Sequence, residues 1–187
     1  MNIQKKELVF SNEDYNSKNG FSTYIWGTCM WQFLHIMSFN YPTNPTDEQK
    51  KDYLQFLKLL EKTLPCKWCR INYGKNIREK DTKLSIKTMK NRETLSRWVC
   101  KLHNKVNKML DKNKHKDYKN TRDFYEQFRA RCTPVKEVNK GQHGGCTVPI
   151  HKGVKSRMVL RIVPRDSKTE VLKINKKCLG ISNGYIK

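Results

Sequence analysis

Apolar residues recur at helical spacing along the first two thirds of the chain, in blocks that turn residues separate. The block at 23–40 is apolar on almost every side, which predicts a buried helix. Tyr41 and Pro42 end it, because proline lacks a backbone donor and disfavours helix in the residue before it. Thr46 then begins a capping box, which predicts a second helix that continues to Leu64.

Three more helices follow in the pattern. Pro65 suits the first position of a third helix, which we expect to reach about Arg78. A polar connection at 79–90 leads to a fourth helix. Its apolar stripe is formed by Leu95, Trp98, Val99, Leu102, Val106 and Met109. A shorter fifth helix is predicted after Thr121, with Cys132 just beyond its end.

The character of the sequence changes after the fifth helix, where glycine and basic residues become frequent. Residues 154–163 and 170–174 alternate or run apolar like short strands. We therefore divide the chain into a flexible N-terminal segment (1–20), a helical domain (21–132) and a basic C-terminal appendage (133–187). The predicted fold class is all-α: a four-helix bundle with a short fifth helix and a small irregular or β-containing appendage.

The net charge of +22 is large for 187 residues and raises the question of nucleic-acid binding. However, 29 of the 39 basic residues are lysines that are spread along the whole chain. This distribution favours a solvated basic surface over a specific nucleic-acid site. No apolar run approaches the ~20 residues that span a bilayer, and the N-terminus lacks an apolar signal-peptide core. We therefore expect neither membrane insertion nor secretion.

Seven cysteines are present, at positions 29, 66, 69, 100, 132, 146 and 178. They are too few and too scattered for a small disulfide scaffold. Cys66 and Cys69 form a Cys-x-x-Cys pair at a helix start, where two sulfurs can bond and the helix dipole favours a thiolate. Together with Cys100 and His103, they also have spacing compatible with a Cys3His zinc site. On spacing alone, redox and zinc chemistry are equally supported.

The fourth predicted helix carries a second group of polar residues along one side. These residues are Cys100, His103, Asn104 and Asn107. Buried asparagine side chains need hydrogen-bond partners, so two of them beside a histidine indicate a polar ligand rather than zinc. Trp31 and His35 share one face of the first helix and could line a cofactor slot opposite them.

Four short motifs occur in a fixed order along the chain. They are Trp26-Gly27-Thr28 with Trp31, Leu34 and His35; Tyr41-Pro42 with Pro45-Thr46; Pro65-Cys66 with Cys69; and Trp98 with Cys100, His103-Asn104, Val106 and Asn107. In order and spacing they resemble the Erv/ALR sulfhydryl oxidases, and look most like the members encoded by large DNA viruses. The resemblance covers about residues 22–112, roughly half of the chain.

This resemblance implies a compact, usually homodimeric bundle that holds FAD non-covalently and oxidises thiol-containing protein substrates. It implies that Cys66 receives electrons from the substrate, that Cys69 lies against the flavin ring, and that oxygen accepts the electrons and forms hydrogen peroxide. The cofactor contacts that it implies are Thr28, Trp31, His35, Tyr41, Cys100, His103, Asn104, Asn107 and Lys112.

The chain also departs from the family pattern. Asp117 stands where members often carry the disulfide partner of Cys100, so Cys100 either pairs with Cys132 or stays reduced. The sequence has no second closely spaced cysteine pair to act as a shuttle, which leaves Cys146 and Cys178 as candidates.

The alternative function is a zinc-stabilised, basic nucleic-acid-binding protein, with Cys66, Cys69, Cys100 and His103 as the ligands. For the oxidase, we expect a location in the host cytoplasm at a viral assembly site or in the virion. The mitochondrial intermembrane space is the alternative location.

Overall fold

The computed structural model describes residues 11–112, 115–132, 144–150, 156–170 and 172–178. These residues form a mainly helical protein, as predicted. In chain order, the elements are α1 (Asn12–Asn16), α2 (Thr23–Asn40), α3 (Asp47–Thr63), α4 (Lys67–Asn76), η1 (Lys80–Thr82), η2 (Ile86–Met89), α5 (Arg92–Met109), α6 (Tyr118–Glu126), β1 (Ala130–Arg131), β2 (Val148–Pro149) and η4 (Lys176–Cys178), where η denotes a 3-10 helix.

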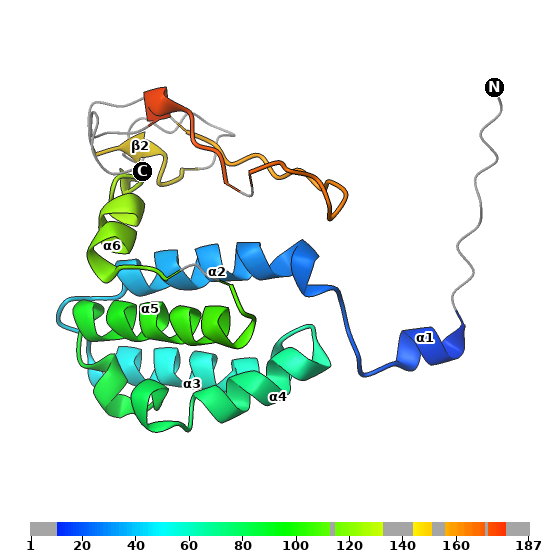
Figure 1. Cartoon of the computed structure of the whole chain (residues 1–187). Coiled ribbons are helices and arrows are strands. Elements are labelled where there is room, and N and C mark those ends of the chain that lie inside the picture. Colours follow the sequence, from blue (N-terminus) through cyan, green and yellow to red (C-terminus); the bar gives the residue numbers. More distant parts are fainter. Residues whose placement is uncertain (1–10, 113–114, 133–143, 151–155, 171, 179–187) are drawn as a thin grey trace.

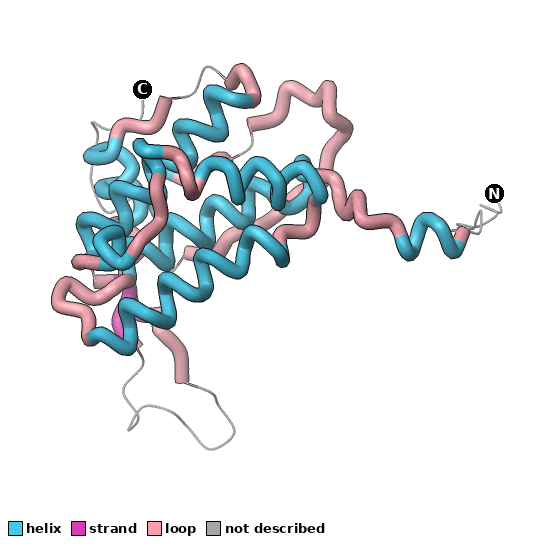
Figure 2. The backbone as a smooth tube through the Cα atoms, turned by 90° about the horizontal axis from the view of Figure 1, so that it is seen from below, coloured by secondary structure: helices cyan, strands magenta, loops and turns pink. Residues whose placement is uncertain are grey.

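Helices α2, α3, α4 and α5 make the bundle. α2 packs against α5, α3 packs against α4, and η2 contacts both α3 and α5. α6 contacts α2 and α5, and α1 lies outside the bundle at the end opposite β1 and β2 (Figure 1 and Figure 2). None of the described helices is long and apolar enough to cross a membrane. The largest fully buried side chains include Tyr41, Leu57, Met89, Leu95 and Leu102.

Side-chain caps determine where the helices begin. The Thr46 hydroxyl accepts the Gln49 N–H at 3.2 Å, and the Gln49 side chain accepts the Thr46 N–H, so the predicted capping box of α3 is confirmed. α6 begins at Tyr118 instead of after Thr121. The reason is that the Asp117 carboxylate caps it.

Two other predictions about the helices were wrong. α4 begins at Lys67 with Cys66 as its N-cap, so Pro65 precedes the helix and does not occupy its first position; the helix ends at Asn76, two residues before the approximate end predicted. α2 has the predicted bounds but is not buried on nearly all sides, since Phe33 and Ile36 are 50% and 52% exposed. Within a single chain, α5 and α6 cover one side of α2, and its remaining apolar residues face outward.

The described part of the N-terminal segment, which we predicted to be flexible, contains a short helix and a bridge to Cys66. Ser11 and Asp14 form a capping box that begins α1. Farther along, Gly20 forms an antiparallel bridge with Cys66. Residues 1–10 of the predicted segment lie outside the described residues.

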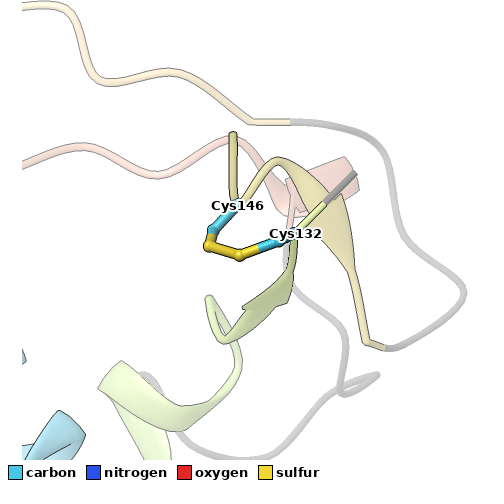
Figure 3. The surroundings of a disulfide bond; sticks show 2 residues. All are labelled: Cys132 and Cys146. Carbon is cyan, nitrogen blue, oxygen red and sulfur yellow. A yellow bond between two sulfur atoms is a disulfide. The ribbon is translucent and has the colours of Figure 1, made fainter. Parts of the chain in front are cut away.

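The strands lie elsewhere than predicted. The described residues of 154–163 and 170–174 form no strand, and residues 154, 155 and 171 lie outside the described part. Instead, β1 pairs antiparallel with β2. A disulfide between Cys132 and Cys146 closes the loop between these strands (Figure 3). Cys132 is therefore not the partner of Cys100, which stays reduced.

Candidate redox site

The predicted dithiol lies at the start of α4. Cys66 is the N-cap residue of this helix, and its sulfur accepts the backbone N–H of Cys69 at 3.2 Å. Both thiols are reduced and partly buried, whereas Trp68 between them is 67% exposed. The N-terminal end of a helix is the positive end of its dipole and favours a negatively charged sulfur, but at Cys69 burial outweighs this effect.

The two sulfurs occupy different surroundings. Cys69 packs against the hydrophobic core. Burial, together with the neighbouring Cys66, raises the pKa of its thiol to about 12, although the positive charge of Arg70 opposes the shift. In the reduced pair, Cys69 therefore keeps its proton at neutral pH.

Trp31, His35 and His103 form a cluster between α2 and α5. The rings of Trp31 and His103 stack with their centroids 3.9 Å apart and their planes 4° from parallel. Nε2 of His35 and Nδ1 of His103 are 2.9 Å apart, so one ring donates its N–H to the other. The predicted meeting of the two helices at these residues thus occurs, although the direct contact between the two histidines was not foreseen.

Burial dominates the electrostatics of this cluster. It lowers the pKa of His35 to about 4, with a smaller contribution from the charge of Lys116. It lowers the pKa of His103 to about 3, with contributions from His35, Lys116 and Lys112. Both rings are therefore neutral at pH 7. Nδ1 of His35 is buried and has no hydrogen-bond partner in the described part of the chain.

A cavity of about 970 Å³ lies between η1, α5 and the turn that follows α5, and none of the three cluster residues lines it. Asp111 has a φ of 50°, in the left-handed region, and turns the chain after α5. This turn lets the Lys112 N–H donate to the Asn107 carbonyl at 2.9 Å. The lining residues are Asp81, Thr82, Lys101, Asn104, Lys105, Asn107, Lys108, Asp111, Lys112 and His115.

Some predicted site residues also hold the protein together. The Asn104 side chain accepts the Lys116 N–H at 2.7 Å and donates to the Lys116 carbonyl at 2.9 Å. The Cys100 thiol donates to the same carbonyl at 3.3 Å, and burial raises its pKa. Tyr41 is 0% exposed, and its hydroxyl donates to the Met89 carbonyl at 2.9 Å. Thr28 is exposed.

Three residues that contact the site were not among the predicted site residues. Tyr125 stacks on His35 with the ring centroids 5.2 Å apart, and the available signal was that Phe124, Tyr125 and Phe128 give the predicted fifth helix an aromatic side. Lys116 anchors Asn104 through its main chain, which no side-chain pattern can reveal. Arg70 donates to the carbonyls of Leu64 and Lys18.

The zinc alternative requires Cys66, Cys69, Cys100 and His103 to converge. Across the described residues, which include these four, no group of three or more histidine, cysteine or acidic side chains is placed to hold a metal ion. His103 instead bonds His35, and Cys100 bonds the Lys116 carbonyl. The geometry therefore does not support the zinc alternative.

Comparison with known proteins agrees with this arrangement. Residues 28–129 match the sequence model of the Erv1/Alr family, and this range contains the dithiol, the Trp31–His35–His103 cluster and the cavity-lining residues. The chain belongs to the Erv1/Alr family. The Erv1/Alr match also includes α6, which carries Tyr125.

Individual Erv1/Alr proteins show similar regions. The chain is 42% identical over 88 residues to the mitochondrial FAD-linked sulfhydryl oxidase ERV1 of Saccharomyces cerevisiae, which covers 47% of this chain and 44% of that protein. It is 31% identical over 104 residues to the FAD-linked sulfhydryl oxidase of African swine fever virus, covering 54% of this chain and 81% of the viral protein.

The fold is also similar to a solved structure, the yeast Erv1 core. That structure is 30% identical to this chain with a TM-score of 0.50, and the likeness covers 66% of this chain and 96% of the core. The chain spans about half the length of several curated relatives that it matches, such as 44% of yeast ERV1. What those whole proteins do is therefore applied to this chain only as a proposal.

Proposed function

We propose that this protein is an FAD-dependent thiol oxidase that forms disulfides in protein substrates. The observation that carries the proposal is the Cys66–Cys69 dithiol at the start of α4, in the same bundle as a neutral Trp31–His35–His103 cluster. Relatives from yeast and from African swine fever virus are named FAD-linked sulfhydryl oxidases. A dithiol alone can exchange disulfides, but it needs a cofactor to transfer electrons onward.

The residues present fit FAD. A flavin has a planar ring that can pack on Trp31 and His103, which already form an aromatic stack. Among the residues that the structure describes, the buried Nδ1 of His35 has no hydrogen-bond partner, and it can accept or donate a hydrogen bond. The cavity between η1, α5 and the turn after α5 has lysines for the phosphates, including the predicted Lys112, and amides from Asn104 and Asn107. Its volume of about 970 Å³ is at the upper end for cofactor sites.

We also propose that Thr28, Tyr41 and Cys100 contact the cofactor. The structure constrains how two of them, Tyr41 and Cys100, can do so. A cofactor can reach the Tyr41 side chain only if the core opens, because this side chain is 0% exposed. Cys100 can contribute through packing, since its thiol already donates to the Lys116 carbonyl.

The dithiol exchanges electrons with the substrate in two steps. A substrate thiolate attacks the Cys66 sulfur of the oxidised pair, and the Cys66–Cys69 bond breaks. The electron pair of that bond leaves on the Cys69 sulfur, which takes up a proton because burial raises its pKa to about 12. A second substrate thiol then displaces Cys66, which leaves a substrate disulfide and a reduced pair. Bound FAD would supply the two-electron acceptor that regenerates the disulfide and passes the electrons to oxygen, forming hydrogen peroxide.

The visible absorption spectrum tests the proposal. We expect a yellow protein whose flavin band bleaches when dithiothreitol is added in air and recovers as oxygen is consumed. Cys66→Ser and Cys69→Ser should each abolish oxygen consumption but retain the flavin. Cys29→Ser is the matched control, since Cys29 is another partly buried free cysteine and has no role in the proposal. A colourless protein, or full activity in either dithiol variant, would refute it.

The expected homodimer belongs to the same proposal. The outward-facing apolar residues of α2, among them Phe33 and Ile36, support it because a second copy can cover them. Phe33 also packs edge-to-face with Phe56 of α3, which extends this apolar surface across two helices. The names of relatives include a mitochondrial protein and viral proteins, and they support the mitochondrial and viral locations respectively as proposals.

A further inference from the structure

The N-terminal segment is attached to the dithiol through main-chain hydrogen bonds. The Phe21 N–H donates to the Pro65 carbonyl at 2.7 Å, and the Lys67 N–H donates to the Asn19 carbonyl at 2.8 Å. These two bonds flank Gly20 and Cys66, which lie opposite each other in an antiparallel bridge. The residues before and after Cys66 thus present a short strand edge, and the protein covers this edge with its own chain.

Arg70 supports this arrangement from α4. Its guanidinium donates to the Leu64 carbonyl at 2.6 Å and to the Lys18 carbonyl at 2.8 Å. All four acceptors on the two segments are main-chain carbonyls, so the edge recognises extended backbone and not a particular side chain. The Phe21 side chain is 77% exposed, which agrees with recognition through the backbone.

The register of the bridge suits disulfide chemistry. Gly20 and Cys66 are a non-hydrogen-bonded pair, because the hydrogen bonds join the residues on either side of them. Such pairs have Cα atoms about 4.5 Å apart, which is within the range that a disulfide spans. A cysteine in a strand at this register would therefore lie within reach of the Cys66 sulfur.

Residues 18–21 cannot themselves exchange disulfides with Cys66, because glycine stands opposite it at position 20. It has a φ of 87°, and a Cβ at this position would meet the Pro65 oxygen at 2.4 Å. No side chain can therefore occupy this place in the present arrangement. A cysteine-bearing strand has to replace the segment rather than add to it.

We propose that the main chain of Pro65, Cys66 and Lys67 is the docking edge for an extended, cysteine-bearing segment of the protein substrate, and that residues 18–21 occupy this edge between turnovers. The inference rests on the proposed thiol oxidase function. Strand addition supplies affinity through the main chain and places one residue opposite Cys66. The substrate cysteine at that position attacks the Cys66 sulfur, the bond to Cys69 breaks, and the electron pair leaves on Cys69.

A pair of variants at one position tests the competition. Phe21→Pro removes the N–H that donates to Pro65, whereas Phe21→Ala shortens the same exposed side chain and keeps that N–H. Oxygen consumption is measured with dithiothreitol and with an extended peptide that carries two cysteines. We expect Phe21→Pro to raise kcat/KM for the peptide about threefold to tenfold, as the loss of one hydrogen bond implies, and to change dithiothreitol oxidation less than twofold. Phe21→Ala should behave like the parent protein.

Gly20→Ala is the second variant, because its methyl group forces the segment off the edge. Gly145→Ala is its control, since a Cβ there meets only ordinary contacts, at 3.6 Å from Thr147. Hydrogen exchange at the Lys67 amide should become faster in Gly20→Ala, and the peptide preference should rise as in Phe21→Pro. Equal changes for peptide and dithiothreitol, or a lower peptide rate, would overturn the docking inference while leaving the oxidase function intact.

A trapping reaction tests the inference independently of turnover. The trapping peptide carries one cysteine as a mixed disulfide with thionitrobenzoate. In the Cys69→Ser background, the Cys66 sulfur attacks the peptide sulfur, expels thionitrobenzoate and stays joined to the peptide by a disulfide. Mass spectrometry identifies the adduct at Cys66. We expect the peptide to be trapped faster in the Phe21→Pro protein than in the Phe21→Ala protein. The small disulfide dithiobis(nitrobenzoate) should react with both proteins at the same rate. Absence of dithiothreitol oxidation in the parent protein would refute the oxidase, and equal trapping rates would refute the docking edge.

Discussion

Lowering the pH below 6.5 should destabilise the bundle through its buried histidine pair. His35 is 0% exposed, and burial lowers its pKa from 6.5 to about 4. The unfolded chain therefore binds a proton near pH 6.5, whereas the folded chain does not until about pH 4. The free energy of unfolding is thus fully retained above pH 6.5 and falls as the pH drops towards 4.

The magnitude follows from the width of this pH window. One proton that binds only to the unfolded state lowers the free energy of unfolding by about 1.4 kcal/mol per pH unit. From pH 6.5 to pH 4, His35 should account for a loss of about 3 kcal/mol. The structural reason is that protonation places a charge on a buried ring whose Nδ1 has no hydrogen-bond partner within the described ranges. His103, whose pKa burial lowers to about 3, adds a second proton that binds only to the unfolded state, so the loss for the pair is larger than the share of His35 alone.

Urea unfolding followed by far-UV circular dichroism measures this effect. His35→Gln keeps a polar side chain that does not titrate, so its free energy of unfolding should fall less steeply below pH 6.5 than that of the parent protein. His115→Gln removes an exposed histidine and should keep the parent's slope. Flavin content is matched in all three proteins. The reasoning would be refuted by an unchanged slope in His35→Gln, or by a flatter slope in His115→Gln.

Three further predictions concern the core, the cavity and the outer face of α2. Tyr41→Phe leaves the Met89 carbonyl without its 2.9 Å donor and should lower the free energy of unfolding by about 1–3 kcal/mol in urea, whereas exposed Tyr24→Phe should change it little. An equal effect at both positions would contradict this. Lys112→Glu reverses a charge at the cavity and should weaken flavin retention on gel filtration; unchanged flavin content would remove Lys112 from the proposed contacts. Phe33→Asp places a charge in the exposed apolar face, so sedimentation should show a shift from dimer to monomer, and a persistent dimer would place the interface elsewhere.

The sequence predicted best those features that depend on neighbouring residues. The bounds of α2 follow from an apolar run and a proline, and the start of α3 follows from the Thr46 capping box. Cys66 and Cys69 could be located because their spacing on a helix start has a chemical meaning. These features need no knowledge of how the helices pack.

Features that depend on packing could not be predicted in this way. Hydrophobicity marks Phe33 and Leu34 alike, but only the folded chain shows that Leu34 faces the core and Phe33 does not. The contact between His35 and His103 joins residues far apart in the chain and requires a particular rotation of both helices. Asp117 was notable for replacing a cysteine, yet its role in the fold is to cap α6.

Hydrogen bonds, and not a disulfide, hold the segment before α6 against the bundle, so reducing agents do not release it. Where Cys100 could have been joined covalently to the segment before α6, the Asn104 amide and the Cys100 thiol hold the Lys116 main chain by hydrogen bonds. The disulfide Cys132–Cys146 joins the last residue of the predicted helical domain to the C-terminal appendage and closes the loop between β1 and β2. An excess of thiol substrate can therefore open the appendage without loosening the walls of the cavity, which suits a protein that works among thiols.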